Sequence, residues 1–557
     1  MHDNDLIDSH QGSAPWWRDA VIYQVYIRSF ADGNGDGMGD IAGIRSKLPY
    51  LRDLGVDAIW INPWYPSPQA DAGYDVADFR DIEPRFGTLD DADQLIAEAH
   101  EHGIRVIPDL VPNHTSDQHV WFQAALAAGP GSPERARYIF RPGRGPDGSE
   151  PPNNWNSCFG GPAWTRVSEP DGSPGEWYLH LFAPEQPDLN WAHREVREEF
   201  ESVLRFWFDR GIDGFRIDVA HGLIKDTDLP DVVAPQGSGY VYPEGEHPHW
   251  DRDEVHEIYR RWRRIADEYP GHRKFVAEAW ADTPQRLANY VRSDGLHTAF
   301  NFDFLQATWN AERLREVIDT TTSSLNAVGA PATWVLSNHD VPRHATRYGR
   351  PPVDWVPGQN YRAAGEADPE LGTRRARAAA LLMLSLPGGA YIYQGEELGL
   401  PEVEDLPEEL LQDPVWERSG HTERGRDGCR VPIPWSGEKP PFGFSPAHAT
   451  ADPWLPQPES WKDRTAEAQT GDPGTMLELY RSALRIRREN PALGEGDLAW
   501  NDAGEGVLSF TRTPGFACAV NLSGQPHRLP AHDHVLLASG ELDDDLLPPD
   551  TAVWLSL

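Results

Sequence analysis

The sequence predicts an α/β fold, namely a (β/α)8 TIM barrel with one inserted domain and a C-terminal antiparallel β-sandwich domain. Two observations lead to this prediction. Short apolar, β-branched segments alternate with longer helical patterns, which is typical of parallel strands joined by crossover helices. Eight such strands can be counted, and several of them end in Asp, Glu or His, where barrel enzymes carry their active sites.

The strands are expected in a regular order along the chain. Each is a short run rich in Val, Ile, Trp, Tyr or Phe, followed by polar or Gly- and Pro-containing residues. The eight predicted strands are 20–27, 56–62, 104–111, 212–219, 273–280, 297–304, 332–340 and 389–395. Helical periodicity predicts helices at 41–55, 88–103 (capped by Thr88 or Asp90), 194–211, 255–270 and 476–490.

Two regions break this alternation. Residues 113–188 are rich in Pro, Gly, Asn and Trp, and we expect an irregular inserted domain after the third strand. Residues 491–557 contain only short alternating strands and predict a small β domain. The catalytic barrel is therefore expected at 1–112 and 189–490.

The composition limits the partners. With 88 acidic against 50 basic residues the formal net charge is −38, which disfavours binding to nucleic acid or to anionic membranes. The three cysteines, Cys158, Cys429 and Cys518, are far apart and predict neither a metal site nor a disulfide framework. No secretory signal and no long apolar run are recognised, so we expect a cytoplasmic protein with no obligate protein partner.

Four predicted strand ends carry titratable residues. They are "PDLVPNHTS" (108–116), "GFRIDVAHG" (214–222), "FVAEAW" (275–280) and "SNHD" (337–340). A carboxylate at the end of an apolar strand is costly to desolvate, and for any single one a structural ion pair is the simpler interpretation. Four of them at one end of a barrel instead favour an active site.

These four segments, in this order, resemble the motif regions of glycoside hydrolase family 13, the α-amylase superfamily. Further segments resemble its oligo-1,6-glucosidase and α-glucosidase branch. They are "DAGYD" (71–75), "NNWNSCFGGPAW" (153–164), "WYLHLF" (177–182), "QPDLNW" (186–191) and "GRDGCRVPIPW" (425–435).

The resemblance implies three catalytic carboxyls. Asp218 matches the nucleophile, Glu278 the general acid/base and Asp340 the transition-state stabiliser. The residue types suit a retaining glycosidase, which needs one attacking and one proton-transferring carboxyl. Arg216 should face the same way as Asp218 and keep it ionised. The apolar neighbours of Glu278 should raise its pKa so that it begins protonated.

The resemblance also implies a pocket for one terminal glucose. Asp71 and Arg426 match a pair that grips the 4- and 6-hydroxyls and blocks the pocket behind the sugar, so the enzyme should be exo-acting. Phe159 and Phe182 either line this pocket or form the core of the insertion. Tyr74 matches the aromatic platform beneath the sugar, and His114 and His339 match residues that bind its hydroxyls.

The stretch "DGNGDGMGD" (32–40) predicts a cation site. Asp32, Asn34 and Asp36 alternate as in an EF-hand loop, although Gly43 stands where an EF-hand has its bidentate Glu. The resemblance implies a structural Ca²⁺ held also by the carbonyl of Met38 and by Asp40. The alternative is an acidic loop without a cation. No organic cofactor is expected, because glycoside hydrolysis uses carboxylates.

The expected function is a retaining exo-α-glucosidase acting on maltose and small maltooligosaccharides. In the family, Val at position 219 tends to accompany α-1,6 cleavage, but the residues after it, "AHG", depart from those usual in isomaltases, and we favour α-1,4. An oligo-1,6-glucosidase and a glucosyltransferase or sucrose isomerase remain alternatives with the same catalytic residues. A non-catalytic transporter partner or a binding module is disfavoured, because all three acids are present.

Overall fold

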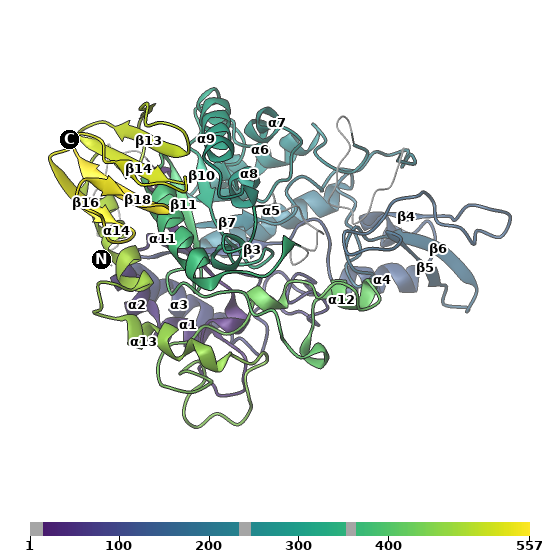
Figure 1. Cartoon of the computed structure of the whole chain (residues 1–557). Helices are drawn as coiled ribbons and strands as arrows, with labels where there is room; N and C mark the ends of the chain where they lie inside the picture. The colour runs from purple at the N-terminus through teal and green to yellow at the C-terminus, as the bar shows by residue number, and fades with distance from the viewer. Residues whose placement is uncertain (1–14, 233–246, 353–363) are drawn as a thin grey trace, which may run out of the picture.

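A computed structural model describes residues 15–232, 247–352 and 364–557 of the chain (Figure 1). It confirms the predicted barrel. Eight parallel strands form one sheet in the order β10-β11-β1-β2-β3-β7-β8-β9. Their bounds are β1 Val21–Val25, β2 Ala58–Ile61, β3 Arg105–Leu110, β7 Gly214–Ile217, β8 Lys274–Ala277, β9 Thr298–Ala299, β10 Thr333–Val335 and β11 Gly389–Tyr393.

Each strand is shorter than the predicted segment, because residues at its ends lie in the connecting segments. The predicted strand 297–304 was wrong at its end, where Phe302–Phe304 begin helix α8 (Phe302–Gln306), capped by the Asn301 side chain.

The register places two charged residues of neighbouring strands side by side. Asp109 on β3 pairs with Arg216 on β7, whose partner on the other side is the apolar Val276 on β8. This register brings a buried carboxyl and a buried guanidinium together inside the barrel.

The predicted helices are present, with one interruption. The segment 41–55 forms two helices, α1 (Ile41–Ser46) and α2 (Leu48–Leu54), because Pro49 lacks the N–H that a continuous helix needs. Thr88, not Asp90, caps α3 (Leu89–Glu101) in a reciprocal capping box with Asp91. The other helices are α4 Val120–Ala128, α5 Arg194–Asp209, α6 Val255–Ala266, α7 Pro284–Tyr290, α8 Phe302–Gln306, α9 Ala311–Asn326, α10 His344–Arg347, α11 Pro369–Ser385, α12 Pro414–Arg418, α13 Ala466–Gln469 and α14 Met476–Glu489.

The region between β3 and β7 is more regular than expected. It contains α4 and a three-stranded antiparallel sheet, β4 (Phe140–Arg141), β5 (Trp164–Ser168) and β6 (Pro174–Leu179), which projects from the barrel (Figure 1). The Pro- and Gly-rich composition that predicted irregular structure belongs to the connections between these short strands. The Lys225 ammonium joins the region to the barrel through Asp188 Oδ2 and Asn113 Oδ1, both at 2.7 Å.

The C-terminal part is antiparallel, as predicted. A five-stranded sheet has the order β12-β13-β14-β18-β16. A second sheet of two strands, β15 and β17, packs on one face of the five-stranded sheet, against Ala517, Val553 and Leu555. On the other face Trp554 donates its indole N–H to the Leu381 carbonyl of α11 at 3.0 Å. The strands are β12 Leu498–Trp500, β13 Val507–Arg512, β14 Phe516–Asn521, β15 His527–Arg528, β16 His534–Ala538, β17 Leu546–Leu547 and β18 Thr551–Ser556.

Two further sequence expectations concern the whole chain. In the three described stretches no helix has the length and apolar character needed to cross a bilayer. All three cysteines are buried and free.

Candidate active site

The predicted catalytic residues lie where the barrel strands end. Asp218 follows β7 directly, Glu278 follows β8 directly, and Asp340 lies in the loop after β10. Because these strands are parallel, their carboxyl ends open at one face of the barrel. The structure therefore gathers three acids from distant parts of the sequence into one cluster at this face, which we call the candidate pocket.

Arg216 is the centre of the catalytic half of this pocket. Its Nη1 donates to Asp109 Oδ1 at 2.8 Å and to Asp218 Oδ1 at 2.5 Å, and its Nη2 lies 3.6 Å from Glu278 Oε2. The arginine side chain is only 3% exposed. One buried guanidinium thus contacts three carboxyls, including both that a double displacement requires.

The electrostatic balance differs from the prediction for Asp218. Burial raises the pKa of Asp218, and the neighbouring carboxyls of Glu278 and Asp109 act in the same direction. Arg216 opposes this rise, as expected, but one positive charge shared by three acids does not outweigh the loss of solvent. The pocket therefore tends to retain a proton on its catalytic side.

Glu278 meets the prediction made for it. Burial raises its pKa to about 7. Its Oε2 accepts the backbone N–H of Val219 at 2.6 Å, and its Oε1 accepts the indole N–H of Trp280 at 2.7 Å. Val219 has φ 46°, a left-handed conformation that is strained for a β-branched residue and that recurs at functional sites.

Tyr74 and His339 form the floor of the same half. Their rings stack at 5.4 Å between centroids, and the Tyr74 hydroxyl lies 2.8 Å from His339 Nε2 and 3.0 Å from Asp109 Oδ2. Gln24 Nε2 donates to His339 Nδ1 at 2.7 Å, which places the imidazole proton on Nε2. Burial lowers the pKa of His339 well below its usual range, so the ring is neutral.

A second cluster of charges forms the opposite half. Arg426 Nη2 donates to Asp71 Oδ1 at 2.9 Å and Arg426 Nη1 to Asp340 Oδ1 at 3.0 Å. Arg430 Nη2 adds a third contact, to Asp340 Oδ1 at 3.1 Å. Burial disfavours the charged Asp340, but the His339 Nε2, 3.3 Å from Asp340 Oδ2, and the guanidiniums of Arg426, Arg430 and Arg216 outweigh this cost. Together they hold the pKa of Asp340 well below its usual range, with His339 acting as a neutral N–H donor and the arginines as charges. The predicted Asp71–Arg426 pair is therefore formed in the structure.

The remaining predicted residues adjoin this cluster. The Phe159 ring lies 5.2 Å from the Arg426 guanidinium and 5.7 Å from the Phe182 ring. Phe182 in turn lies 5.2 Å from His114. Both phenylalanines belong to the buried core of the inserted region, which is one of the two interpretations given for them, and the lining of a sugar pocket stays a prediction.

Sequence reasoning missed four residues of the site. Asp109, Gln186, Asp413 and Arg430 are all buried and bind predicted site residues. Gln186 Nε2 donates to Asp71 Oδ2 at 3.2 Å, and Asp413 Oδ2 accepts Arg426 Nε at 2.5 Å. Asp109, Gln186 and Arg430 lie within the quoted motifs and could have been selected there. Asp413 lies outside every quoted motif, and no sequence pattern around it indicates a functional residue.

The loop 32–40 contains buried carboxyls, Asp32 and Asp40, that pair with no basic side chain of the described residues. Asp32 Oδ1 accepts Gly35 N at 2.6 Å, and Asp40 Oδ1 accepts Gly43 N at 2.6 Å as the N-cap of α1. Burial raises the pKa of Asp40 to about 6. No group of three or more His, Cys, Asp or Glu side chains in the described part of the chain is arranged to hold a metal. The oxygen donors present suit a hard cation only if Asn34 and the Met38 carbonyl take part.

Comparison with known proteins agrees with this geometry. The model of the alpha amylase catalytic domain matches residues 24–496. A probable alpha-glucosidase of Rhizobium meliloti (strain 1021) is 39% identical, with 92% of this chain and 90% of that protein covered. An oligo-1,6-glucosidase of Parageobacillus thermoglucosidasius is 33% identical, with 95% and 94% covered. The crystal structure of an alpha-glucosyl transfer enzyme superposes with a TM-score of 0.84 at 37% identity, covering 98% of this chain and 99% of that one.

The matches extend over nearly the whole chain and include the strands that carry the three acids. The relatives are glucosidases by name, and a glycoside hydrolase needs the carboxyl pair that lies around Arg216. This chain belongs to the α-amylase family, glycoside hydrolase family 13, in the branch that contains the α-glucosidases and oligo-1,6-glucosidases.

Proposed function

We propose that the protein is a retaining exo-α-glucosidase that releases glucose from the non-reducing end of maltose and small maltooligosaccharides. The observation that carries the proposal is the pair of carboxyls on one guanidinium, with Arg216 reaching both Asp218 and Glu278. Such closeness suits a nucleophile and an acid/base, whereas an inverting enzyme needs a gap for a water molecule.

The reaction proceeds in two displacements. Asp218 attacks the anomeric carbon while Glu278 donates its proton to the glycosidic oxygen, and the released sugar leaves with that proton. Water then attacks the glucosyl ester as Glu278 takes one of its protons, which frees Asp218 and glucose. The raised pKa of Glu278, about 7, suits both steps near neutral pH. The anionic Asp340 stabilises the positive charge that develops on the sugar ring.

The exo mode is supported by the second charge cluster. Arg426 joins Asp71, Asp340 and Asp413 in one cluster of ion pairs, which in the proposed function closes the pocket behind the terminal glucose. A chain that continued beyond the terminal glucose would have to displace buried ion pairs, which is costly. Short substrates should therefore be cleaved faster than starch.

Initial rates on maltose, isomaltose, sucrose, trehalose and starch test this proposal, with Asp218→Asn as the control. We expect maltose to exceed isomaltose, starch to be poor and the variant to lose essentially all turnover. Isomaltose as the best substrate would instead assign the chain to the oligo-1,6-glucosidases. Equal inactivity of wild type and variant on every sugar would overturn the hydrolase proposal.

Glucosyl transfer is the second candidate. It is favoured by the likeness to the alpha-glucosyl transfer enzyme, which extends over 98% of this chain. Transfer would use the same glucosyl-Asp218 ester, with a hydroxyl of an acceptor in place of water. The ratio of free glucose to new glycosides at high maltose concentration separates the two reactions.

We propose further that the loop 32–40 binds Ca²⁺ in a structural role. The buried carboxyls of Asp32 and Asp40 support this proposal, because neither forms an ion pair with a basic side chain in the described residues. Asn34, Asp36 and the Met38 carbonyl would complete the oxygen donors. Calcium would stabilise the connection between β1 and α1, away from the proton transfers of the reaction.

A further inference from the structure

Trp280 lies two residues beyond Glu278 and is absent from the set of site residues that the sequence motifs supplied. Its indole N–H donates to Glu278 Oε1 at 2.7 Å, and the Val219 amide donates to Oε2 at 2.6 Å. Each oxygen of the acid/base therefore has one N–H donor. Only the donor on Oε1 belongs to a side chain.

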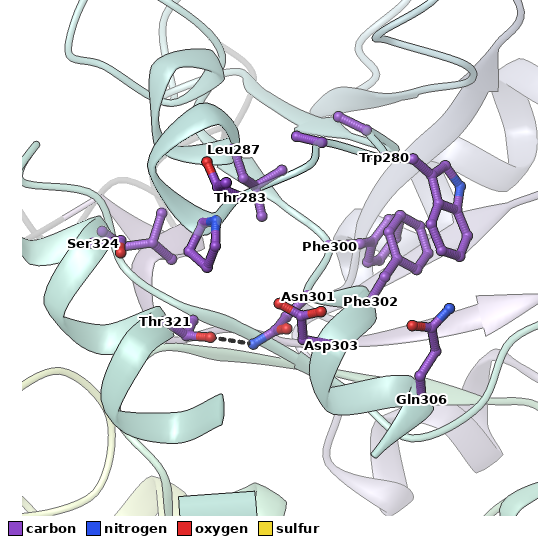
Figure 2. Close-up of a pocket in the computed structure, with 14 residues that line it drawn as sticks. Trp280, Thr283, Leu287, Phe300, Asn301, Phe302, Asp303, Gln306, Thr321 and Ser324 are labelled. Atoms are coloured by element: carbon purple, nitrogen blue, oxygen red, sulfur yellow. Dashed lines mark hydrogen bonds between the residues drawn. The ribbon is translucent and has the colours of Figure 1, made fainter. Parts of the chain in front are cut away.

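Two features keep the indole in place. Its ring stacks on Phe302 with 3.9 Å between centroids and an interplanar angle of 4°. Figure 2 shows Trp280, Phe300 and Phe302 together on one side of a cavity, with Leu287 of α7 and the N-cap Thr283 opposite; the cavity volume is about 70 Å³. Because this cavity leaves space beside Trp280, close packing on that side does not fix the indole. The stack on Phe302 and the hydrogen bond to Glu278 hold it instead.

We propose that Trp280 is a positioning residue for Glu278, fixing the orientation of the acid/base carboxyl through Oε1 while Phe302 supports the indole. The proposal rests on the proposed function. A carboxyl that donates and then removes a proton must stay aligned with the glycosidic oxygen and with the water that replaces it. The Val219 amide and the Arg216 guanidinium both lie at Oε2, and without the indole Oε1 would lose the hydrogen bond that limits tilting of the carboxyl.

The hydrogen bond also has a charge effect. An N–H donor stabilises a carboxylate more than a neutral carboxyl, so the indole favours loss of the proton while burial opposes it. Removing the donor should therefore strengthen proton binding by Glu278. A residue that only fills space would not change proton binding in this direction.

The test is the pH dependence of kcat/KM for Trp280→Phe, which keeps a ring to stack on Phe302 and removes the N–H. We expect the alkaline limb to move upward by about one pH unit, the size of one hydrogen bond to a charged group. We also expect kcat to fall by about tenfold on maltose. On α-glucosyl fluoride, whose leaving group needs less protonation, the loss should be smaller.

Trp500→Phe is a matched control. Trp500, at the end of β12, is partly buried, and its indole N–H donates to the Asp319 carboxylate of α9 at 2.6 Å. The same chemical change there should leave both the pH profile and the ratio of rates on the two substrates unchanged. Phe302→Leu serves as the second variant if Trp280→Phe does not fold, and should move the limb upward by a smaller amount.

An unmoved alkaline limb in folded Trp280→Phe would overturn the proposal. The proposal would also fail if Trp280→Phe changed KM differently for maltose and α-glucosyl fluoride while its alkaline limb stayed at the wild-type pH. That result would mean that Trp280 contacts the substrate. Wild-type inactivity on every α-glucoside would reject the proposed function itself. An active wild type with an unaffected Trp280→Phe variant would reject only the role of Trp280.

Discussion

The two halves of the pocket differ in how many cations they supply for a similar number of acids. On the catalytic side Arg216 alone contacts Asp109, Asp218 and Glu278. On the opposite side Arg426 and Arg430 contact acids that include Asp71 and Asp340. The catalytic side is short of positive charge and retains a proton, whereas Asp340 stays anionic. The placement of guanidiniums therefore supports the roles that we propose, Glu278 as acid/base and Asp340 as stabiliser.

The largest effect is expected from removing the single cation of the catalytic side. Arg216→Gln leaves buried carboxyls without a charged partner and should lower the free energy of unfolding by about 3–5 kcal/mol, with loss of activity. Urea unfolding and maltose hydrolysis measure both. Arg205→Gln, which breaks the exposed ion pair with Glu268, should cost less than about 1 kcal/mol. Equal costs for the two variants would contradict the central position of Arg216.

A weaker effect is expected on the side with two cations. Arg426→Lys keeps the charge but loses the planar fork that reaches Asp71, Asp340 and Asp413 at once. We expect KM for maltose to rise by about 10- to 100-fold, which corresponds to about 1.4–2.7 kcal/mol. The activity on starch relative to maltose should increase, because the end of the pocket opens. An unchanged substrate range would contradict the blocking role of this cluster.

The proton retained on the catalytic side predicts a pH dependence. The donor step needs protonated Glu278, and burial raises its pKa to about 7 in the folded protein. The active form is therefore present below pH 7 and is lost as the pH rises through that value, so kcat/KM should fall by about tenfold per pH unit on the alkaline side. Maltose hydrolysis from pH 5 to 10 measures this limb. A limb centred near the ordinary pKa of a glutamate would contradict the effect of burial.

The barrel could be predicted because its strands are short, apolar and evenly distributed, and the acids that end them stand within recognisable motifs. Local signals failed where tertiary contacts decide the outcome. The inserted region was predicted to be irregular because its turns are rich in Pro and Gly. This composition outweighed the short apolar patterns of the strands β5 and β6 in the prediction. Asp413 reaches Arg426 through folding of the long loop after β11, and no sequence pattern indicates that contact. The raised pKa of Asp218 could not be predicted either, because the sequence does not show that Arg216 also contacts Asp109 and Glu278.

The smallest effect concerns the loop 32–40. It contrasts with both halves of the pocket because its carboxyls bind backbone N–H groups and, among the residues that the structure describes, no guanidinium. If Ca²⁺ binds there, chelation with EGTA should lower Tm by a few degrees, since a ligand at 100 times its Kd contributes about 2.7 kcal/mol. Asp32→Asn should have a similar Tm with and without chelator, while kcat at a temperature below unfolding stays near wild type. A wild-type Tm that is unaffected by EGTA, together with no bound calcium by elemental analysis, would contradict the site. The buried Asp40 would then be held by backbone N–H groups, those of Gly33 and Asn34 in the loop and that of Gly43 at the N-terminus of α1.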